Sequence, residues 1–165
     1  MLRKIFFTGA LLIWLTIIFL FSAKPADEST EMSTSVGKAI CSVFISDYSS
    51  WSIDKQEDMA AMIDFPVRKC AHASEYALLG FLLLFTADSY IFTKAFKGRI
   101  AVICGVLYAV SDELHQLFVP GRSCQVTDMM IDSAGVCAGI LCGYLVMKII
   151  CIVSGRDAFS SHRNA

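Results

Sequence analysis

The chain has 165 residues, 56% of them hydrophobic, and its mean hydropathy is +0.61. This is too apolar for an ordinary soluble domain, and the apolar residues come in long blocks, so the composition indicates one small membrane domain. The net charge of −1 gives no bias toward nucleic acid, and we expect no nucleic-acid partner.

The first apolar block covers residues 5–21 and follows Arg3 and Lys4. It is at the short end of the roughly 20 residues that a spanning helix needs. The block resembles the apolar region of a signal peptide, but Phe21 stands where cleavage requires a small residue. We therefore expect an uncleaved signal anchor.

The segment between residues 22 and 68 is polar and rich in acids. Apolar residues recur in it at helical spacing twice, at 36–44 and at 59–63. This pattern predicts two short interfacial amphipathic helices, which lie on the membrane surface or pack over the other helices; packing is the simpler interpretation. Pro66 suits the first position of the helix that follows.

Three further apolar blocks predict spans at about 68–87, 100–118 and 129–153, joined by a basic loop at 88–99 and a short turn after Pro120. The last block has glycines spaced at i, i+4, which favour close helix contact within the chain more than dimerisation. We therefore predict an all-α fold: a polytopic bundle of four transmembrane helices that forms a single domain over residues 1–165.

The distribution of charge predicts the orientation of this bundle. Arg3 and Lys4, the 88–99 loop and the tail after residue 153 are basic, whereas residues 22–69 carry an excess of acids. Basic segments stay in the cytoplasm. Both termini are therefore expected inside, and the acidic segment and the 121–128 turn outside.

Ionisable residues occur at the outer ends of three predicted spans, where such groups are costly and usually partnered. His72, Glu75 and Tyr76 share a helix face, and Asp112 repeats that spacing with His115 and Gln116. We expect one outward-facing pocket to contain Arg68, Lys69, His72, Glu75, Tyr76, Asp112, Glu113, His115, Gln116, Arg122, Asp128 and Asp132.

Several chemistries fit these residues. The candidate catalytic residues are His72, Glu75, Asp112, Glu113, His115 and Asp132, with general acid–base roles for the histidines and carboxylates. The candidate substrate-binding residues are Arg68, Lys69, Tyr76, Gln116, Arg122 and Asp128. Binding of a divalent metal by His72, His115 and Asp112 is a further alternative. The sequence has no HExxH motif, nucleophile elbow or P-loop.

A non-catalytic interpretation stands beside these. Buried charges of opposite sign neutralise one another and hold helices in register. The chain would then be a membrane scaffold or a protein that alters access to the membrane. Whether it is an enzyme stays open.

Two of the seven cysteines, Cys70 and Cys124, flank spans on the predicted outer side, where a disulfide between them is conceivable. Trp14 and Trp51 are interpreted as anchors at the membrane interface.

Four sequence motifs resemble the VanZ-like family of bacterial membrane proteins. They are Phe21-Ser22-Ala23-Lys24-Pro25, Arg68-Lys69-x-Ala71-His72-x-x-Glu75-Tyr76, Ser111-Asp112-Glu113-x-His115-Gln116-x-Phe118-x-Pro120-Gly121-Arg122, and Asp128-x-x-x-Asp132-x-x-Gly135.

The resemblance implies a multi-pass protein of a bacterial cytoplasmic membrane. The family is named for a member linked to resistance to teicoplanin-type glycopeptides, so resistance is the functional expectation, through action on a lipid or cell-wall precursor or on the antibiotic. The partners expected are the lipid bilayer and a lipid-linked or glycopeptide ligand. An acyl-tailed antibiotic acts at the outer leaflet, in agreement with an outward-facing pocket.

Overall fold

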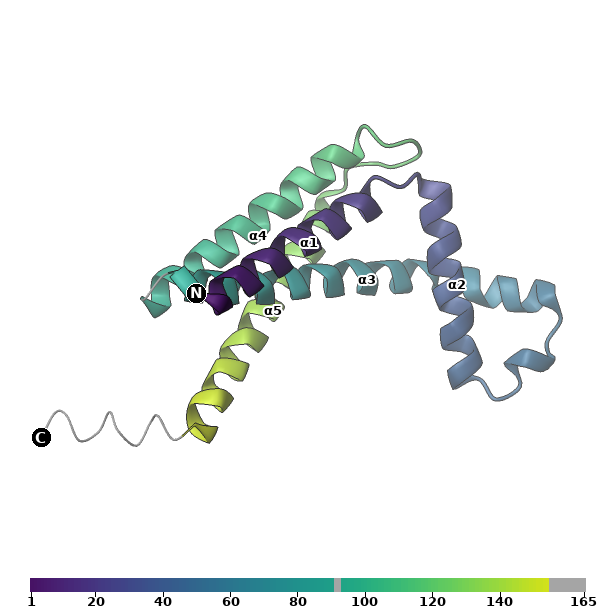
Figure 1. Ribbon diagram of the computed structural model, residues 1–165. Helices are drawn as coiled ribbons and strands as arrows, with labels where there is room; N and C mark the ends of the chain where they lie inside the picture. Colours follow the sequence, from purple (N-terminus) through teal and green to yellow (C-terminus); the bar gives the residue numbers. More distant parts are fainter. Residues whose placement is uncertain (91–92, 155–165) are drawn as a thin grey trace, which may run out of the picture.

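The computed structural model describes residues 1–90 and 93–154, and this part of the chain is helical without strands, as expected for the all-α class (Figure 1). The predicted basic tail lies almost entirely outside the described residues. The helices are α1 (Leu2–Ser22), α2 (Ala26–Phe44), the short 3₁₀ helix η1 (Tyr48–Ser50), α3 (Ile53–Tyr90), α4 (Lys94–Gln116) and α5 (Val126–Val153).

Helix α3 is the central element and packs against α1, α2, α4 and α5, as Figure 1 shows. The four apolar helices share one core, because each must bury one stripe of its surface against its neighbours. The buried residues of this core are Ile18, Tyr76, Leu79, Leu84, Ala101, Ala109, Val136 and Ile140.

Three of the described helices, α1, α3 and α5, are long and apolar enough to cross a membrane. Helix α4 does not join them, because it carries cations near its start and Asp112 and Glu113 near its end. The count of four spans therefore stays a prediction.

One end of the bundle is held by a shared carboxylate. Asp88, near the end of α3, forms ion pairs with Arg3 at the start of α1 and with Lys97 at the start of α4. These three helix ends therefore lie together, as the predicted alternation of helix directions requires.

The predicted helix start at Pro66 is wrong, because α3 runs through Pro66 without a break for 38 residues. A proline inside a helix removes one backbone hydrogen bond, at a cost of about 3 kcal/mol. Helix α2 packs along the first turns of α3, where Gly37 lies against Ala60 and Ile63. The separate short helix predicted around residues 59–63 is thus the beginning of α3.

The loop predicted at 88–99 is also shorter than expected, since α3 continues to Tyr90 and α4 begins at Lys94. Trp14, interpreted from the sequence as an interface anchor, also has a role inside the bundle. Its indole nitrogen donates a hydrogen bond to the backbone carbonyl of Glu75, 2.9 Å away. The side chain joins α1 to α3.

Helix α2 forms where an amphipathic helix is predicted, but its apolar stripe does not pack over the bundle. Val36, Val43 and Phe44 are 51%, 77% and 82% exposed. The face against α3 consists instead of small residues at i, i+4 spacing, Ser33, Gly37 and Cys41, which are buried. Small residues allow close helix contact, so they decided which face packs.

Helices α3 and α5 make the closest contact in the bundle. A Cβ atom on Gly139 would lie 1.7 Å from the carbonyl oxygen of Ala77, and one on Gly80 would lie 2.2 Å from that of Val136. The glycines of α5 therefore serve packing within the chain, as predicted.

This contact predicts that Gly139→Ala destabilises the protein, because the new methyl group meets backbone that cannot turn aside. Overpacking of this kind costs about 1–3 kcal/mol. Thermal unfolding in detergent micelles would show a lowered midpoint. Gly9→Ala is the matched control, since nothing lies within 4 Å of its Cβ position. Equal midpoints for the two variants would contradict the prediction.

Candidate functional site

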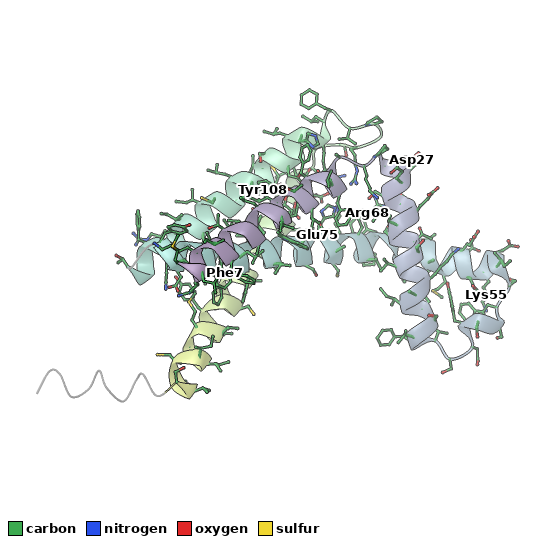
Figure 2. The ribbon with its side chains drawn as sticks, viewed as in Figure 1. Phe7, Asp27, Lys55, Arg68, Glu75 and Tyr108 are labelled. Atoms are coloured by element: carbon green, nitrogen blue, oxygen red, sulfur yellow. The ribbon has the colours of Figure 1, made fainter. Side chains whose placement is uncertain are left out.

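The polar residues predicted from the sequence gather at the end of the bundle away from Asp88. Here the middle of α3 meets the end of α4, the α4–α5 loop and the start of α5. Figure 2 shows Arg68 and Glu75 on α3, in the corner between the end of α1 and the start of α2.

Some of these residues join helices to one another. Lys69 of α3 forms an ion pair with Asp128 in the first turn of α5, and both side chains are less than one-fifth exposed. Glu113 of α4 accepts a hydrogen bond from the backbone N–H of Gln125, at 2.9 Å. The Gln116 amide donates to Glu113 at 3.2 Å. These contacts have a clear structural role.

Asp132 is different, because it is fully buried and neither of its carboxylate oxygens has a hydrogen-bond partner among the described residues. Glu75, Asp112 and Glu113 all lie within electrostatic range of it. The Tyr76 hydroxyl lies within range of Asp112 and Asp132. A buried carboxylate without partners is unfavourable, so this acidic cluster requires an explanation beyond stability.

His72 and Glu75 lie one helical turn apart on the same face of α3. His72 is within electrostatic range of Arg122 and Asp128, and Glu75 is within range of Asp112 and Arg122. The His72 Nδ1 is buried without a partner in the described part of the chain. The predicted grouping of His72 and Glu75 with Asp112 is therefore present.

His115 does not join this group. Its ring packs on Phe19 of α1, with ring centroids 4.8 Å apart, because its position on α4 turns it toward α1. Within residues 1–90 and 93–154, no three His, Cys, Asp or Glu side chains are placed to hold a metal ion. The metal site suggested for His72, His115 and Asp112 therefore does not fit the structure.

A cavity of about 550 Å³ opens beside His72 and Glu75. One wall is the apolar stripe of α2, with Met32, Val36 and Ile40. Its size lies within the roughly 300–1,000 Å³ typical of small-molecule sites. The exposed apolar stripe of α2 thus lines a largely apolar pocket, to which α3 adds Arg68, His72 and Glu75.

Sequence reasoning missed this wall and also Lys24, which lines the cavity. The Lys24 ammonium lies 3.1 Å from the sulfur of Met32 and 5.9 Å from the centroid of the Phe21 ring. Two signals in the sequence marked these residues: the Phe21–Pro25 motif, and an apolar stripe on an acidic helix.

The turn between α1 and α2 is fixed to the α4–α5 loop. The Ala26 N–H donates to the carbonyl of Pro120, and the Arg122 Nε donates to that of Lys24, both at 3.2 Å. Gly121 between them has a φ of 72°, which favours glycine, and a Cβ there would lie 3.0 Å from that of Ala26. Two separate motifs thus form one corner of the cavity.

Arg122 lines the cavity, partly buried. Burial, and then the nearby Arg68, lower the pKa of its guanidinium below the usual range, while Asp112, Glu113 and Asp128 oppose this. The group nevertheless stays charged at neutral pH, because an arginine is not deprotonated in proteins. The site therefore presents a positive charge that is costly to bury.

The disulfide considered between Cys70 and Cys124 is absent, since all seven cysteines are free thiols. Cys70 is exposed and lines the cavity instead.

The ion pair between Lys69 and Asp128 generates a stability prediction. Asp128→Asn leaves Lys69 partly buried without its counter-charge, and should cost about 1–3 kcal/mol, between the values for exposed and fully buried pairs. The midpoint of thermal unfolding in micelles measures this loss.

Glu57→Gln is the matched control, because it breaks an exposed pair with Lys38. Lys69→Met added to Asp128→Asn should restore part of the stability. A double variant no more stable than Asp128→Asn would show that the charge on Lys69 is not the cause.

Comparison with known proteins places this arrangement in a family. No curated protein and no solved structure matches the chain. The family model described as VanZ/LLP1 matches residues 7–148, from the first turns of α1 into the last turns of α5. The matched segment contains both motifs at the corner of the cavity and the acidic cluster behind it, and the chain belongs to the VanZ/LLP1 family.

Proposed function

We propose that the chain is a membrane protein of the bacterial cell envelope whose His/Asp/Glu/Arg pocket faces outward. The pocket acts on a lipid or cell-wall precursor, or on a lipophilic glycopeptide, and in this way gives resistance to teicoplanin. The observation that carries the proposal is the cavity of about 550 Å³, which joins an apolar wall to His72, Glu75 and Arg122.

The outer surface supports a membrane position for α4 as well as for the three candidate spans. Ile103 and Leu107 of α4 are 57% and 64% exposed, and Leu141 and Leu145 of α5 are 62% and 54% exposed. Exposed apolar residues in such number mark contact with lipid or another protein. We therefore propose that α4 is the fourth membrane-spanning helix.

The charges support the proposed orientation. Arg3 and Lys97 meet at the end of the bundle away from the cavity. Because basic ends stay in the cytoplasm, the cavity belongs on the outer side, with both chain termini inside.

His72 and Glu75 are the groups that would handle a proton in an enzymatic version. Both line the cavity, and the His72 Nδ1 has no partner within the described residues. An imidazole accepts or delivers a proton near neutral pH, which is the property that general acid–base catalysis requires. Asp112 and Asp132 lie behind Glu75 as part of the same charged group.

A second candidate is a non-catalytic scaffold. The contacts that favour it are the Lys69–Asp128 ion pair, which joins α3 to α5, and the hydrogen bond from the Gln125 N–H to Glu113, which joins the α4–α5 loop to α4. On this proposal, loss of the charged residues lowers the amount of folded protein but removes no separate activity.

Teicoplanin susceptibility of a host expressing the protein tests the first candidate. His72→Ala, Glu75→Gln and Asp112→Asn are each expected to return susceptibility to that of the host without the protein, because they remove two groups of the cavity wall and the carboxylate that interacts with Glu75. Membrane levels are matched by immunoblot, and Glu57→Gln, on the exposed first turns of α3, is the control that keeps protection.

Protection that survives in all three well-expressed variants would assign these residues to structure and favour the scaffold. A wild type that gives no protection would contradict the resistance part of the proposal.

The orientation is tested separately with Cys124, a free thiol in the α4–α5 loop. A variant that keeps only Cys124 should be labelled by a membrane-impermeant maleimide in intact cells, because the loop lies outside in the proposed topology. The variant without cysteines is the control. Labelling that requires permeabilised cells would place the pocket on the cytoplasmic side.

A further inference from the structure

Two of the cations at the cavity have no direct ion-pair partner among the described residues. Of the described residues that line it, three are cations, Lys24, Arg68 and Arg122, and only Glu75 is a carboxylate. Within residues 1–90 and 93–154, neither Lys24 nor Arg122 forms an ion pair. An uncompensated charge in a partly buried site is unfavourable unless a ligand supplies the counter-charge.

The surroundings of Lys24 show the same shortage of negative charge. Its ammonium contacts the sulfur of Met32 and faces the Phe21 ring, both of which are weak partners for a cation. These two side chains also line the cavity. Lys24 is therefore held at the cavity by apolar groups.

The two arginines are close enough to repel each other. Arg68 is partly neutralised by Asp64, 2.5 Å away, but its Nε is buried without a partner in the described part of the chain. The carboxylates within range of Arg122 include Asp128, which is already paired with Lys69. An anion between the two guanidinium groups would relieve this repulsion.

The opposite wall suits a hydrocarbon chain. Met32, Val36 and Ile40 follow one another along α2 inside the cavity, and Val43 and Phe44 continue the same apolar surface toward the end of the helix. Val43 and Phe44 are 77% and 82% exposed. A chain that begins in the cavity thus has an apolar path out of it.

We propose that this cavity binds an anionic lipid, whose phosphate group contacts Lys24, Arg68 and Arg122 and whose hydrocarbon chain lies along the stripe of α2. The proposal names the class of ligand that the site of the proposed function binds. It rests on that function only for the outward position of the cavity. A phosphate monoester fits better than a carboxylate, because its charge approaches −2 and it offers three acceptor oxygens to the three cations, whereas a carboxylate has two oxygens and one charge.

The size of the cavity also fits part of such a lipid. About 550 Å³ is enough for a head group and the first part of a chain, and the remainder would follow Val43 and Phe44 into the bilayer. Free phosphate would contact only the cations, and an uncharged alcohol would contact only the apolar stripe of α2.

Native mass spectrometry of the full-length protein, released from detergent micelles, tests the proposal with three probes. Hexadecyl phosphate carries both the charge and the chain, hexadecanol carries the chain alone, and inorganic phosphate carries the charge alone. We expect one molecule of hexadecyl phosphate per protein, at an affinity at least tenfold above that of either other probe.

Charge-removing variants locate the head group. Lys24→Gln and Arg122→Gln are each expected to weaken hexadecyl phosphate binding about tenfold, which corresponds to about 1.4 kcal/mol. Lys38→Gln is the matched control, since Lys38 lies on α2 outside the cavity and pairs with Glu57. Two variants are used so that a folding defect in one of them does not decide the result.

A bulky residue locates the chain. Val36→Trp fills the space along α2 and should weaken binding of the lipid, whereas Ser42→Trp, an exposed position on the same helix away from the cavity and the apolar stripe, should not.

Equal binding of hexadecanol and hexadecyl phosphate would overturn the proposal, as would equal affinities of Lys24→Gln, Arg122→Gln and Lys38→Gln. Inorganic phosphate that competes as well as the lipid would show a site for the free anion instead. Binding with the expected pattern in a protein that gives no teicoplanin protection would refute the resistance function and leave the lipid site standing.

Discussion

The close contact between α3 and α5 is the constraint on which the site depends. At Gly139 the two backbones approach until no side chain fits between them, and this fixes the rotation of α5 about its axis. Asp132 lies seven residues before Gly139, and Gly135 lies between them at helical spacing, so all three share the face toward α3. The contact that packs the helices therefore also carries Asp132 into a buried position beside the polar part of α3.

The polar residues fall into two groups once their partners are compared. Lys69 and Glu113 have partners on α5 and in the α4–α5 loop, and Gln116 has its partners within α4; these contacts explain why the three residues are buried. His72 and Asp132 have buried polar atoms without hydrogen bonds among the described residues. A protein retains such atoms when they serve something other than stability, since partnered or apolar replacements would cost less free energy. His72 and Asp132 lie where the cavity and the acidic cluster meet, whereas the buried His115 Nδ1, also without a hydrogen bond among the described residues, lies beside Phe19.

Hydropathy and helical spacing were enough to predict four apolar helices and the approach of Glu75, Asp112 and Asp132, because these depend on local periodicity and helix direction. They were not enough to predict three other features. Pro66 indicated a helix start, yet α3 continues through it, and the turns before it pack against α2. His115 shares a helix face with Asp112 in the sequence pattern, but its ring packs on Phe19. The cavity wall on α2 was missed because small residues, rather than the largest apolar ones, decided which face of that helix packs.

The ion pairs of Asp88 have a consequence for a protein that sits in an energised membrane. One carboxylate serves two cations from different helices, so the assembled cluster keeps a net charge of about one positive unit. In the proposed orientation, this charge stays on the negative side of the membrane potential, which holds it there by about 2.3 kcal/mol per 100 mV. In that orientation, the positive charge that would direct insertion of the first helix is still present after folding, and the same residues would oppose inversion of the bundle.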